Sequence, residues 1–384
     1  MKENADEFLE ASRLLIGKDA VDSRLSNTIA DLATIAGYST ALGNDNPLFV
    51  DPEYAAKRRY GCVVAPLTFF AAVRYPMSSG AFSKKDYGLA DFLDTVMFER
   101  YDVVRVGAKL SADVRLTSVE GEEIGEKRVA LLTSEGSYLD QCGTLVGEAK
   151  STMRMVPFKR GEEMFVTRDI HKYTDEEIKR VEDDLDSETM RGGDTLYWGD
   201  VNVGDKLTPV VKGPLSLIEI ANWRSATRVN EWSLEIVYRE AKANPGLRRV
   251  NPVTCWPYWH TDLEDQSYHT CVLRGISLPF APGLLQACLA EHLLTNWIGD
   301  DGFLKMLRMQ VRMPFIYGDV NWYRGIVRDK YKEKRGGELY GAVEVGIEAL
   351  NQLGEVAALG DAVAYLPSVQ HEVVLPIPRG ISKV

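Results

Sequence analysis

Apolar and polar residues alternate along several stretches of the chain, whereas one stretch repeats with the spacing of a helix. Alternation with a period of two runs through residues 103–118 and 126–139, and again through residues 321–331 and 339–350. This period is typical of strands that bury one face. Residues 282–299 are apolar at helical spacing, with Pro282 suited to the first turn and Gly299 to the end. The pattern therefore predicts both strands and at least one long buried helix.

The chain also resembles itself. Residues 138–157 and 349–367 share a Leu, then Asp or Asn, then a Gln-x-Gly turn between two apolar alternating runs. Each of these stretches predicts a β-hairpin that leads into a closing strand. Upstream, residues 63–70 resemble residues 279–286, and both contain an Ala-Pro pair. An internal repeat of this kind indicates two copies of one structural unit.

Each Ala-Pro pair opens a helical pattern that is followed by strands. The chain therefore predicts two α+β units, each with one long helix wrapped by an antiparallel sheet. Residues 173–194 are acidic and poor in large apolar side chains, which is typical of a surface helix and linker. We expect a first unit over residues 1–157, a linker over 158–194, a second unit over 195–368 and an extended tail over 369–384.

Composition narrows the classes of protein that fit. The apolar and charged fractions, 45% and 26%, are those of a soluble globular protein. A formal net charge of -11 argues against nonspecific nucleic-acid binding. The five cysteines are far apart and form no cluster with histidine, so neither a disulfide framework nor a zinc site is predicted. The apolar stretch over residues 62–73 is too short to cross a membrane, and we expect a cytoplasmic protein without a membrane partner.

One short motif points to chemistry. Residues 43–51, "GNDNPLFVD", resemble the Asp-x-Asn-Pro-x-His signature of hydratases that act on acyl thioesters. With Asn46 and Pro47 aligned, Asn44 stands at the Asp position and Phe49 at the His position. Adjacent Asn and Pro residues form turns, so the first half keeps the turn and lacks the catalytic side chains.

The repeat offers a place for the missing imidazole. Upstream of the second Ala-Pro pair stands His260-Thr261-Asp262, which we take as the counterpart of Phe49-Val50-Asp51 upstream of the first pair. The second half then carries a histidine where the first half carries a phenylalanine. Chemistry is therefore expected in the second half.

On these motifs the chain resembles the MaoC-like acyl-CoA hydratase/dehydratase family in its double-hotdog form. The first half is similar through residues 38–70, and the second through residues 197–216, 259–262, 293–304 and 318–325. The resemblance implies an α+β fold of two fused hotdog domains. It also implies reversible hydration of a 2-enoyl-CoA to a 3-hydroxyacyl-CoA, with the R isomer as product and no metal or redox cofactor. Coenzyme A then enters only as part of the thioester substrate.

The reaction needs a base for water and donors for the oxyanion that develops on the thioester. His260 with Asp262 is the expected pair for proton transfer. Free N–H groups at the start of a helix suit the oxyanion. Since Pro282 has no N–H, we expect Gly283 or Leu284 to donate. Phe49 and Asn44 are then expected to line the acyl pocket from the first half.

Some residues depart from the family pattern. The usual acid, five residues before the histidine, falls on Cys255, which is a poor general base unless its pKa is strongly lowered. Asp262, Glu264 and Asp265 are the alternative carboxylates. Asp262 has a counterpart, Asp51, in the half that lacks the catalytic side chains, and this favours a structural role for Asp262. His260 itself has a structural alternative as a hydrogen-bonded imidazole. We expect His292 to be a packed or surface histidine.

Two other functions stay open. The chain could be a non-catalytic subunit of a heteromeric enoyl-CoA hydratase, for which Cys255 in place of the acid is the best support. It could also be an acyl-CoA thioesterase, because one fold hosts several chemistries. The expected partner is an acyl-CoA thioester, with a homodimer and a heteromeric hydratase complex as alternative assemblies.

Overall fold

The computed structural model describes residues 2–20, 24–83, 87–159, 161–228, 249–258, 267–379 and 382–383, with isolated positions between 239 and 245. The first half begins with four helices: α1 (Lys2–Arg13), α2 (Leu32–Ala41), α3 (Pro47–Val50) and α4 (Pro52–Ala55). The short helices η1 (Leu67–Phe69), α5 (Phe70–Val73) and η2 (Gly80–Ser83) follow. Four strands complete it: β1 (Leu89–Arg100), β2 (Ser111–Ile124), β3 (Lys127–Leu139) and β4 (Leu145–Pro157).

The linker contributes helix α6 (Asp175–Asp186), and the second half repeats the order of helices before strands. Its first part contains η3 (Trp198–Asp200), β5 (Val210–Lys212), α7 (Leu217–Thr227), β6 (Arg249–Val250), β7 (Pro257–Tyr258) and η6 (Cys271–Arg274). Helices α9 (Gly283–Cys288) and α10 (Ala290–Ile298) follow. The strands are β8 (Phe303–Val311), β9 (Asn321–Arg335), β10 (Glu338–Asn351), β11 (Val356–Leu366) and β12 (Ser382–Lys383).

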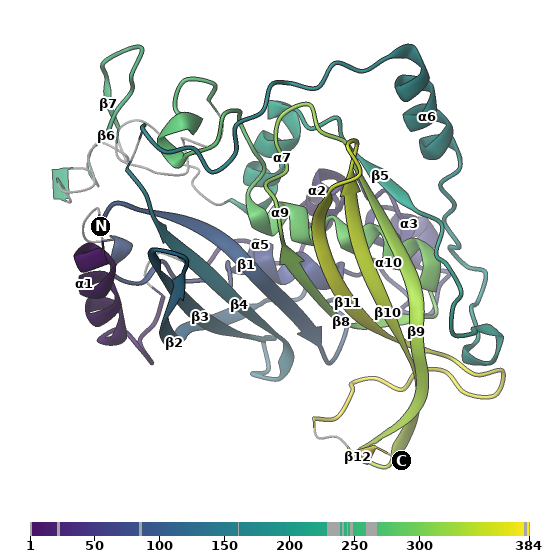
Figure 1. Ribbon diagram of the computed structural model, residues 1–384. Coiled ribbons are helices and arrows are strands. Elements are labelled where there is room, and N and C mark those ends of the chain that lie inside the picture. Colours follow the sequence, from purple (N-terminus) through teal and green to yellow (C-terminus); the bar gives the residue numbers. More distant parts are fainter. Residues whose placement is uncertain are drawn as a thin grey trace.

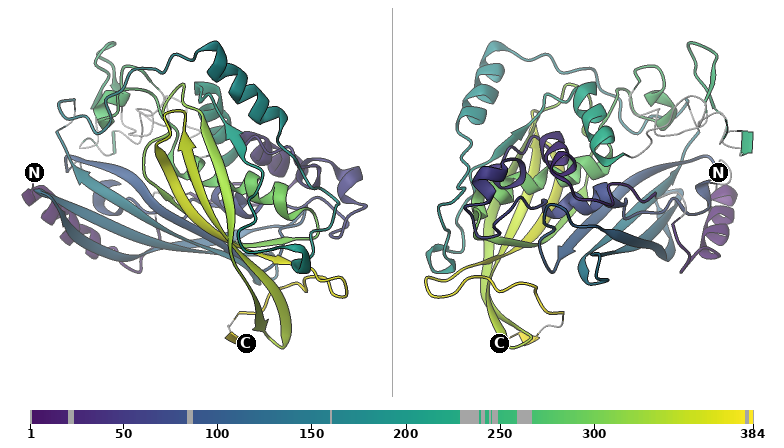
Figure 2. Two further views of the ribbon diagram at one scale, coloured as in Figure 1. Left: turned by 45° about the vertical axis from the view of Figure 1, so that its right-hand side comes forward. Right: turned by 180° about the vertical axis from the view of Figure 1, so that it is seen from behind.

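One antiparallel sheet joins the two halves. In the described part of the chain it has the order β12-β9-β10-β11-β8-β1-β4-β3-β2, with β5 beside β9. The halves meet where β1 pairs with β8, from Thr95 opposite Gln310 to Glu99 opposite Met306. Figure 1 shows the strands as one curved layer, and Figure 2 shows from behind the helices that cover its inner face. The predicted α+β class is confirmed.

The two predicted hairpins are confirmed and share one turn chemistry. In the β3–β4 turn the Asp140 carboxylate accepts from the N–H groups of Cys142 (2.8 Å) and Thr144 (2.9 Å). In the β10–β11 turn the Asn351 amide oxygen accepts from Leu353 (3.0 Å) and Glu355 (2.9 Å). The turn glycines, Gly143 and Gly354, have φ values of +77° and +76°. The repeat seen in the sequence is therefore present in the backbone.

The helices agree with the pattern in one half only. Helices α9 and α10 span the predicted stretch, with a single turn residue, Leu289, between them. In the first half the helical segment ends at Val73, which is shorter than the long helix predicted from Pro66. Arg74 is already extended, and its guanidinium is bound to the Asp19 carboxylate at 2.9 Å. Pro76 restricts the residue before it to extended backbone, which prevents the helix from continuing.

Helices α2 and α7 occupy matching places ahead of the two halves and pack against each other. The rings of Tyr38 and Trp223 lie 5.5 Å apart, and both side chains are fully buried. One turn before each ring, Ile35 and Ile220 are also fully buried. Helix α7 therefore occupies the place in the second half that α2 occupies in the first. The residues that directly follow α7, 229–238, lie outside the part of the chain that the structure describes.

The linker helix has the surface character that its composition predicts. Thr174 and Glu177 form a capping box at the start of α6, and Val181 is its buried residue. The helix lies at the periphery in Figure 1, and Asp184 accepts a hydrogen bond from the Trp322 indole at 2.7 Å. The proposed domain limits at residues 157, 194 and 368 stay predictions. Among the helices that the structure describes, none has the length and apolar character of a membrane span.

Candidate functional site

The start of α9 is the place where the sequence predicts oxyanion donors. Ala281 is fixed in front of it by a hydrogen bond from its N–H to the Phe315 carbonyl at 2.8 Å. Pro282 occupies the N-cap position without a side-chain cap. Within the described residues, the N–H groups of Gly283 and Leu284 have no hydrogen-bond acceptor. The first turn of α9 therefore presents two unused donors, as such a role requires.

Gly283 is a glycine because another strand passes close by. A Cβ atom added to Gly283 would lie 2.8 Å from the Leu93 Cβ of strand β1. This is too close for two carbon atoms, so a side chain would push α9 away from the first half. The donor pair thus lies against a strand of the other half, at the junction of the two units.

The first half contains the same pair of donors, and there they are occupied. Leu67 and Thr68 follow Ala65-Pro66 as Gly283 and Leu284 follow Ala281-Pro282. The Leu67 N–H donates to one carboxylate oxygen of Glu291 at 2.5 Å, and the Thr68 N–H donates to the other at 2.9 Å. The Thr68 hydroxyl adds a third hydrogen bond at 2.5 Å. In this copy the two backbone N–H groups bind the oxygens of a carboxyl group.

Glu291 belongs to α10 and is buried, with an exposed fraction of 1%. Burial raises the pKa of its carboxyl, while the hydrogen bonds from Thr68 and the charge of Arg100 act in the opposite direction. Tyr38 supports the assembly, because its hydroxyl donates to the Thr68 carbonyl at 2.7 Å. The donor pair of Leu67 and Thr68 is therefore closed to another ligand.

Asn44 and Asn46 hold the motif loop. The Asn44 side chain is fully buried and donates to the Thr295 hydroxyl of α10 at 3.0 Å. Its own oxygen accepts from the Asn46 N–H at 3.2 Å, and Asn46 caps α3 through the Leu48 N–H at 2.9 Å. Phe49 lies in α3 with an exposed fraction of 4%. These residues fold the loop against the second half.

The predicted site residues do not all come together. Thr295, the partner of Asn44, follows Gly283 by 12 residues in the sequence, which is about 18 Å along a helix. Gly283 lies at the start of the α9–α10 run, whereas Asn44 lies near its end. His260 and Asp262 lie outside the described residues, so their roles stay predictions. Cys255 is exposed in the turn between β6 and β7, with φ +55°.

A buried Lys–His pair next to the motif loop was not predicted from the sequence. The Lys212 ammonium donates to His292 Nδ1 at 2.6 Å, to the Leu42 carbonyl at 2.9 Å and to the Gly43 carbonyl at 3.1 Å. Burial lowers the pKa of Lys212 to about 8, and burial beside Lys212 lowers the pKa of His292 to about 3. His292 is thus a packed, neutral histidine. The sequence feature that could have indicated Lys212 is its position as the charged residue of the otherwise apolar strand β5.

Asp51 has a structural role. Its carboxylate accepts from the N–H groups of Glu53 at 2.9 Å and Tyr54 at 3.1 Å, which caps helix α4. The basic residues nearby are also engaged in holding the two halves together. Arg58 pairs with the buried Asp300 at 3.3 Å, and Arg59 donates to the Asp301 carbonyl at 2.9 Å. These contacts connect α4 to the end of α10.

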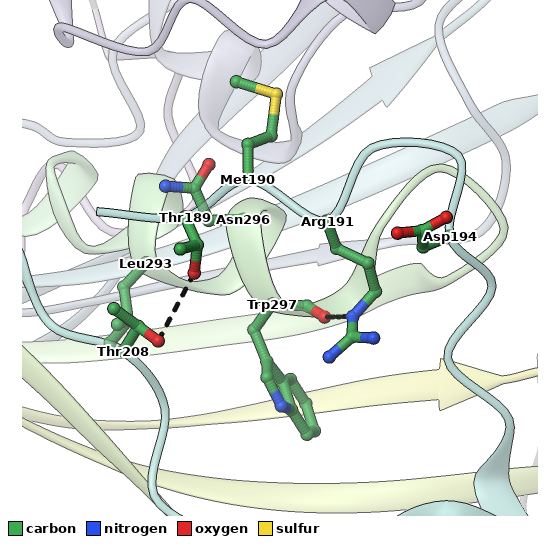
Figure 3. A pocket seen from close by; sticks show the side chains of 8 residues that line it. All are labelled: Thr189, Met190, Arg191, Asp194, Thr208, Leu293, Asn296 and Trp297. Atoms are coloured by element: carbon green, nitrogen blue, oxygen red, sulfur yellow. Dashed lines mark hydrogen bonds between the residues drawn. The ribbon is translucent and has the colours of Figure 1, made fainter. Parts of the chain in front are cut away.

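A cavity of about 250 Å³ lies on another side of α10 and is shown in Figure 3. It is lined by Thr189, Met190, Arg191, Asp194, Thr208, Leu293, Asn296 and Trp297. Arg191 donates to the Trp297 carbonyl at 2.8 Å and so caps the end of α10. None of the predicted site residues that the structure describes lines this cavity. Among the described residues, no cluster of His, Cys, Asp or Glu could hold a metal ion.

The family match lies in the first half of the chain. Residues 24–149 match the family described as FAS1-like, dehydratase domain region. No curated protein sequence matches the chain.

Solved structures resemble the chain over most of its length. A MaoC-like dehydratase aligns with a TM-score of 0.59 and 18% identity, covering 92% of this chain and 99% of that one. A putative MaoC domain protein dehydratase from Chloroflexus aurantiacus J-10-fl has a TM-score of 0.53 and 14% identity, covering 93% of each chain. A conserved hypothetical protein from Mycobacterium tuberculosis with a double hotdog fold has a TM-score of 0.52 and 12% identity, covering 91% of this chain and 94% of that one.

At these identities the structural likeness establishes the fold. The resemblance predicted from the sequence motifs is confirmed at that level, through the two Gln-x-Gly hairpins and the continuous sheet. The chain therefore has the double-hotdog fold, and its residues 24–149 are similar to the family described as FAS1-like, dehydratase domain region.

Proposed function

We propose that the chain catalyses the reversible hydration of a 2-enoyl-CoA to a 3-hydroxyacyl-CoA at the start of α9. The observation that carries this proposal is the pair of twin backbone sites. One copy holds a carboxylate on the N–H groups of Leu67 and Thr68, while the other copy, Gly283 and Leu284, has unused donors among the described residues. A thioester has a single carbonyl oxygen, so both N–H groups of the second pair are proposed to donate to that one oxygen.

In the proposed reaction the thioester oxygen accepts from Gly283 and Leu284. His260 removes a proton from water as the water oxygen bonds to the β-carbon. Electrons of the double bond move toward the thioester, and the developing negative charge on its oxygen is stabilised by the two N–H groups. A proton then adds to the α-carbon, which balances the addition of water. His260, with Asp262 as its orienting carboxylate, is the proposed carrier of this proton.

The proposed path of the acyl chain follows the junction of the halves, because Gly283 lies against Leu93 of the first half. Phe49 and Asn44 belong to the filled copy of the site, so their proposed contribution is to the shape of the junction. The proposed reaction is the addition of water across the double bond, with coenzyme A present only as part of the substrate.

The test is a panel of straight, branched and aromatic 2-enoyl-CoAs mixed with the purified chain. Hydration removes the absorbance of the conjugated enoyl thioester and releases no thiol. The proposal expects loss of this absorbance for at least one acyl group and formation of the 3-hydroxyacyl-CoA. Release of free thiol would instead show a thioesterase. Turnover that appears only after a second protein is added would show a non-catalytic subunit.

A further inference from the structure

Helix α10 meets the motif region of the first half with three successive polar contacts. Glu291 binds the Leu67 and Thr68 N–H groups, and Thr295 binds Asn44 one turn later. Between them His292 accepts from Lys212, which also holds the Gly43 carbonyl. The partners of Glu291 and Thr295 belong to the first half, and the partner of His292, Lys212, is itself bound to the first half through Gly43. The second half thus contacts both parts of the first site, the donor pair and the motif loop.

The Glu291 carboxylate has the surroundings of a bound ligand. It receives three hydrogen bonds, from two backbone N–H groups and one hydroxyl, at 2.5–2.9 Å. The nearby cation Arg100 is also buried; its Nε donates to the Leu304 carbonyl at 2.7 Å and its guanidinium lies 4.5 Å over the Phe303 ring. A carboxylate removed from water costs several kcal/mol unless donors compensate. The donors, Leu67 and Thr68, come 224 and 223 residues before Glu291 in the chain.

We propose that Glu291 is a resident carboxylate ligand that fills the first half's copy of the thioester site, so that the chain has one acyl site rather than two. The contact occupies the donors that an acyl group would need in the first half, and it also fixes α10 against that half. Identification of the filled site as a former thioester site rests on the proposed function. Carboxylate binding by Leu67 and Thr68 rests on the observed contacts alone.

The experiment replaces the ligand and supplies it from solution. In Glu291→Ala the N–H groups of Leu67 and Thr68 lose their acceptors, so the melting temperature should fall by several degrees and both amide NMR signals should shift. Formate or acetate should then restore part of the melting temperature along a saturating curve and move both signals back. Chloride at the same ionic strength should do neither.

Two further variants keep the test decisive. Glu291→Gln preserves the size of the side chain but places an NH₂ group against the same donors, so it should also lower stability and shift both signals. Glu333→Ala is the matched control, because Glu333 is buried but bound by the side chains of Tyr365 and Arg335 rather than by backbone N–H groups. It should leave the Leu67 and Thr68 signals unchanged.

The proposal is overturned if Glu291→Gln keeps the stability and amide signals of the wild type. It is equally overturned if formate and acetate act on Glu291→Ala no more than chloride does. None of these readouts uses turnover. A wild-type chain that hydrates no enoyl-CoA would end the proposed function and leave the carboxylate result unaffected.

Discussion

At the scale of single residues, the polar groups buried between the halves determine how the protein responds to acid. His292 has an exposed fraction of 5%, and its pKa of about 3 lies well below its ordinary value. In the folded chain it stays neutral down to about pH 3, whereas in the unfolded chain it takes up a proton below about pH 6.5. The stabilisation from neutral His292 is therefore complete above pH 6.5 and is lost as the pH falls toward 3.

The variant His292→Asn tests this effect. An Asn oxygen can accept from Lys212 in place of Nδ1 and does not titrate. Between pH 7 and pH 5 the wild type should lose about 2 kcal/mol more unfolding free energy than the variant. Below about pH 6.5 the unfolded wild type binds one more proton than the folded protein, which lowers its stability by about 1.4 kcal/mol per pH unit. Urea unfolding at a series of pH values measures the difference. Parallel curves for the two proteins would contradict the account.

Residue-level reasoning from the sequence succeeded where a side chain acts on its own neighbours. Asn46 and Asp51 cap the short helices that follow them, as turn-forming and capping residues do. Glu291 and Lys212 could not be predicted, because their partners lie far away in the sequence and appear only when the halves pack. Their roles depend on backbone groups, which carry no signature in the sequence.

At the scale of elements, the two hairpin turns are copies and should respond alike to the same substitution. Gly143 and Gly354 both have left-handed backbone, and a Cβ atom at either would meet no atom within 4 Å. Any cost of Gly→Ala therefore comes from the backbone conformation itself, about 1–2 kcal/mol at each position. Thermal or urea unfolding of Gly143→Ala and Gly354→Ala should show similar losses. An unchanged stability in one of them would mean that the turns are not equivalent.

The helices show the limit of pattern reasoning at this scale. The apolar spacing of residues 282–299 predicts α9 and α10, because the whole run is buried inside one sheet. The pattern after Pro66 is also apolar, yet the helix stops at Val73. Pro76 prevents the helix from continuing. Tertiary contacts then hold the extended backbone at Arg74: its guanidinium binds Asp19, and its carbonyl accepts from the Tyr138 hydroxyl at 2.7 Å.

At the scale of the whole molecule, the two halves form one cooperative structure. They share the β1–β8 pairing, the Glu291 contacts and the ties of Arg58 and Arg59 to the end of α10. The carboxyl-terminal tail adds a hydrogen bond from the Ile377 N–H to the Tyr101 carbonyl at 2.6 Å. Calorimetry should therefore give a single unfolding transition with equal calorimetric and van't Hoff enthalpies. Two separate transitions would show that the halves are independent domains.

The internal repeat was the part of the architecture most accessible from sequence. It predicted two α+β units with matching hairpins, and the continuous sheet confirms them. How one half closes the site of the other was not accessible, because it depends on the packing of α10 across the junction. The assignment of chemistry to the second half still depends on His260, which stays a prediction.

The most direct measurement of the central claim compares two substitutions on the enoyl-CoA that the chain hydrates best. His260→Ala should lower kcat by roughly 10²–10⁴ while binding of the substrate changes little, because a general base acts only on the chemical step. Phe49→Ala, the matched change in the filled half, should cost about 3–5 kcal/mol of stability because the ring is buried, with kcat nearly unchanged. If both variants hydrate at similar rates close to the wild-type rate, His260 is not the base and the assignment of the reaction to the second half is contradicted.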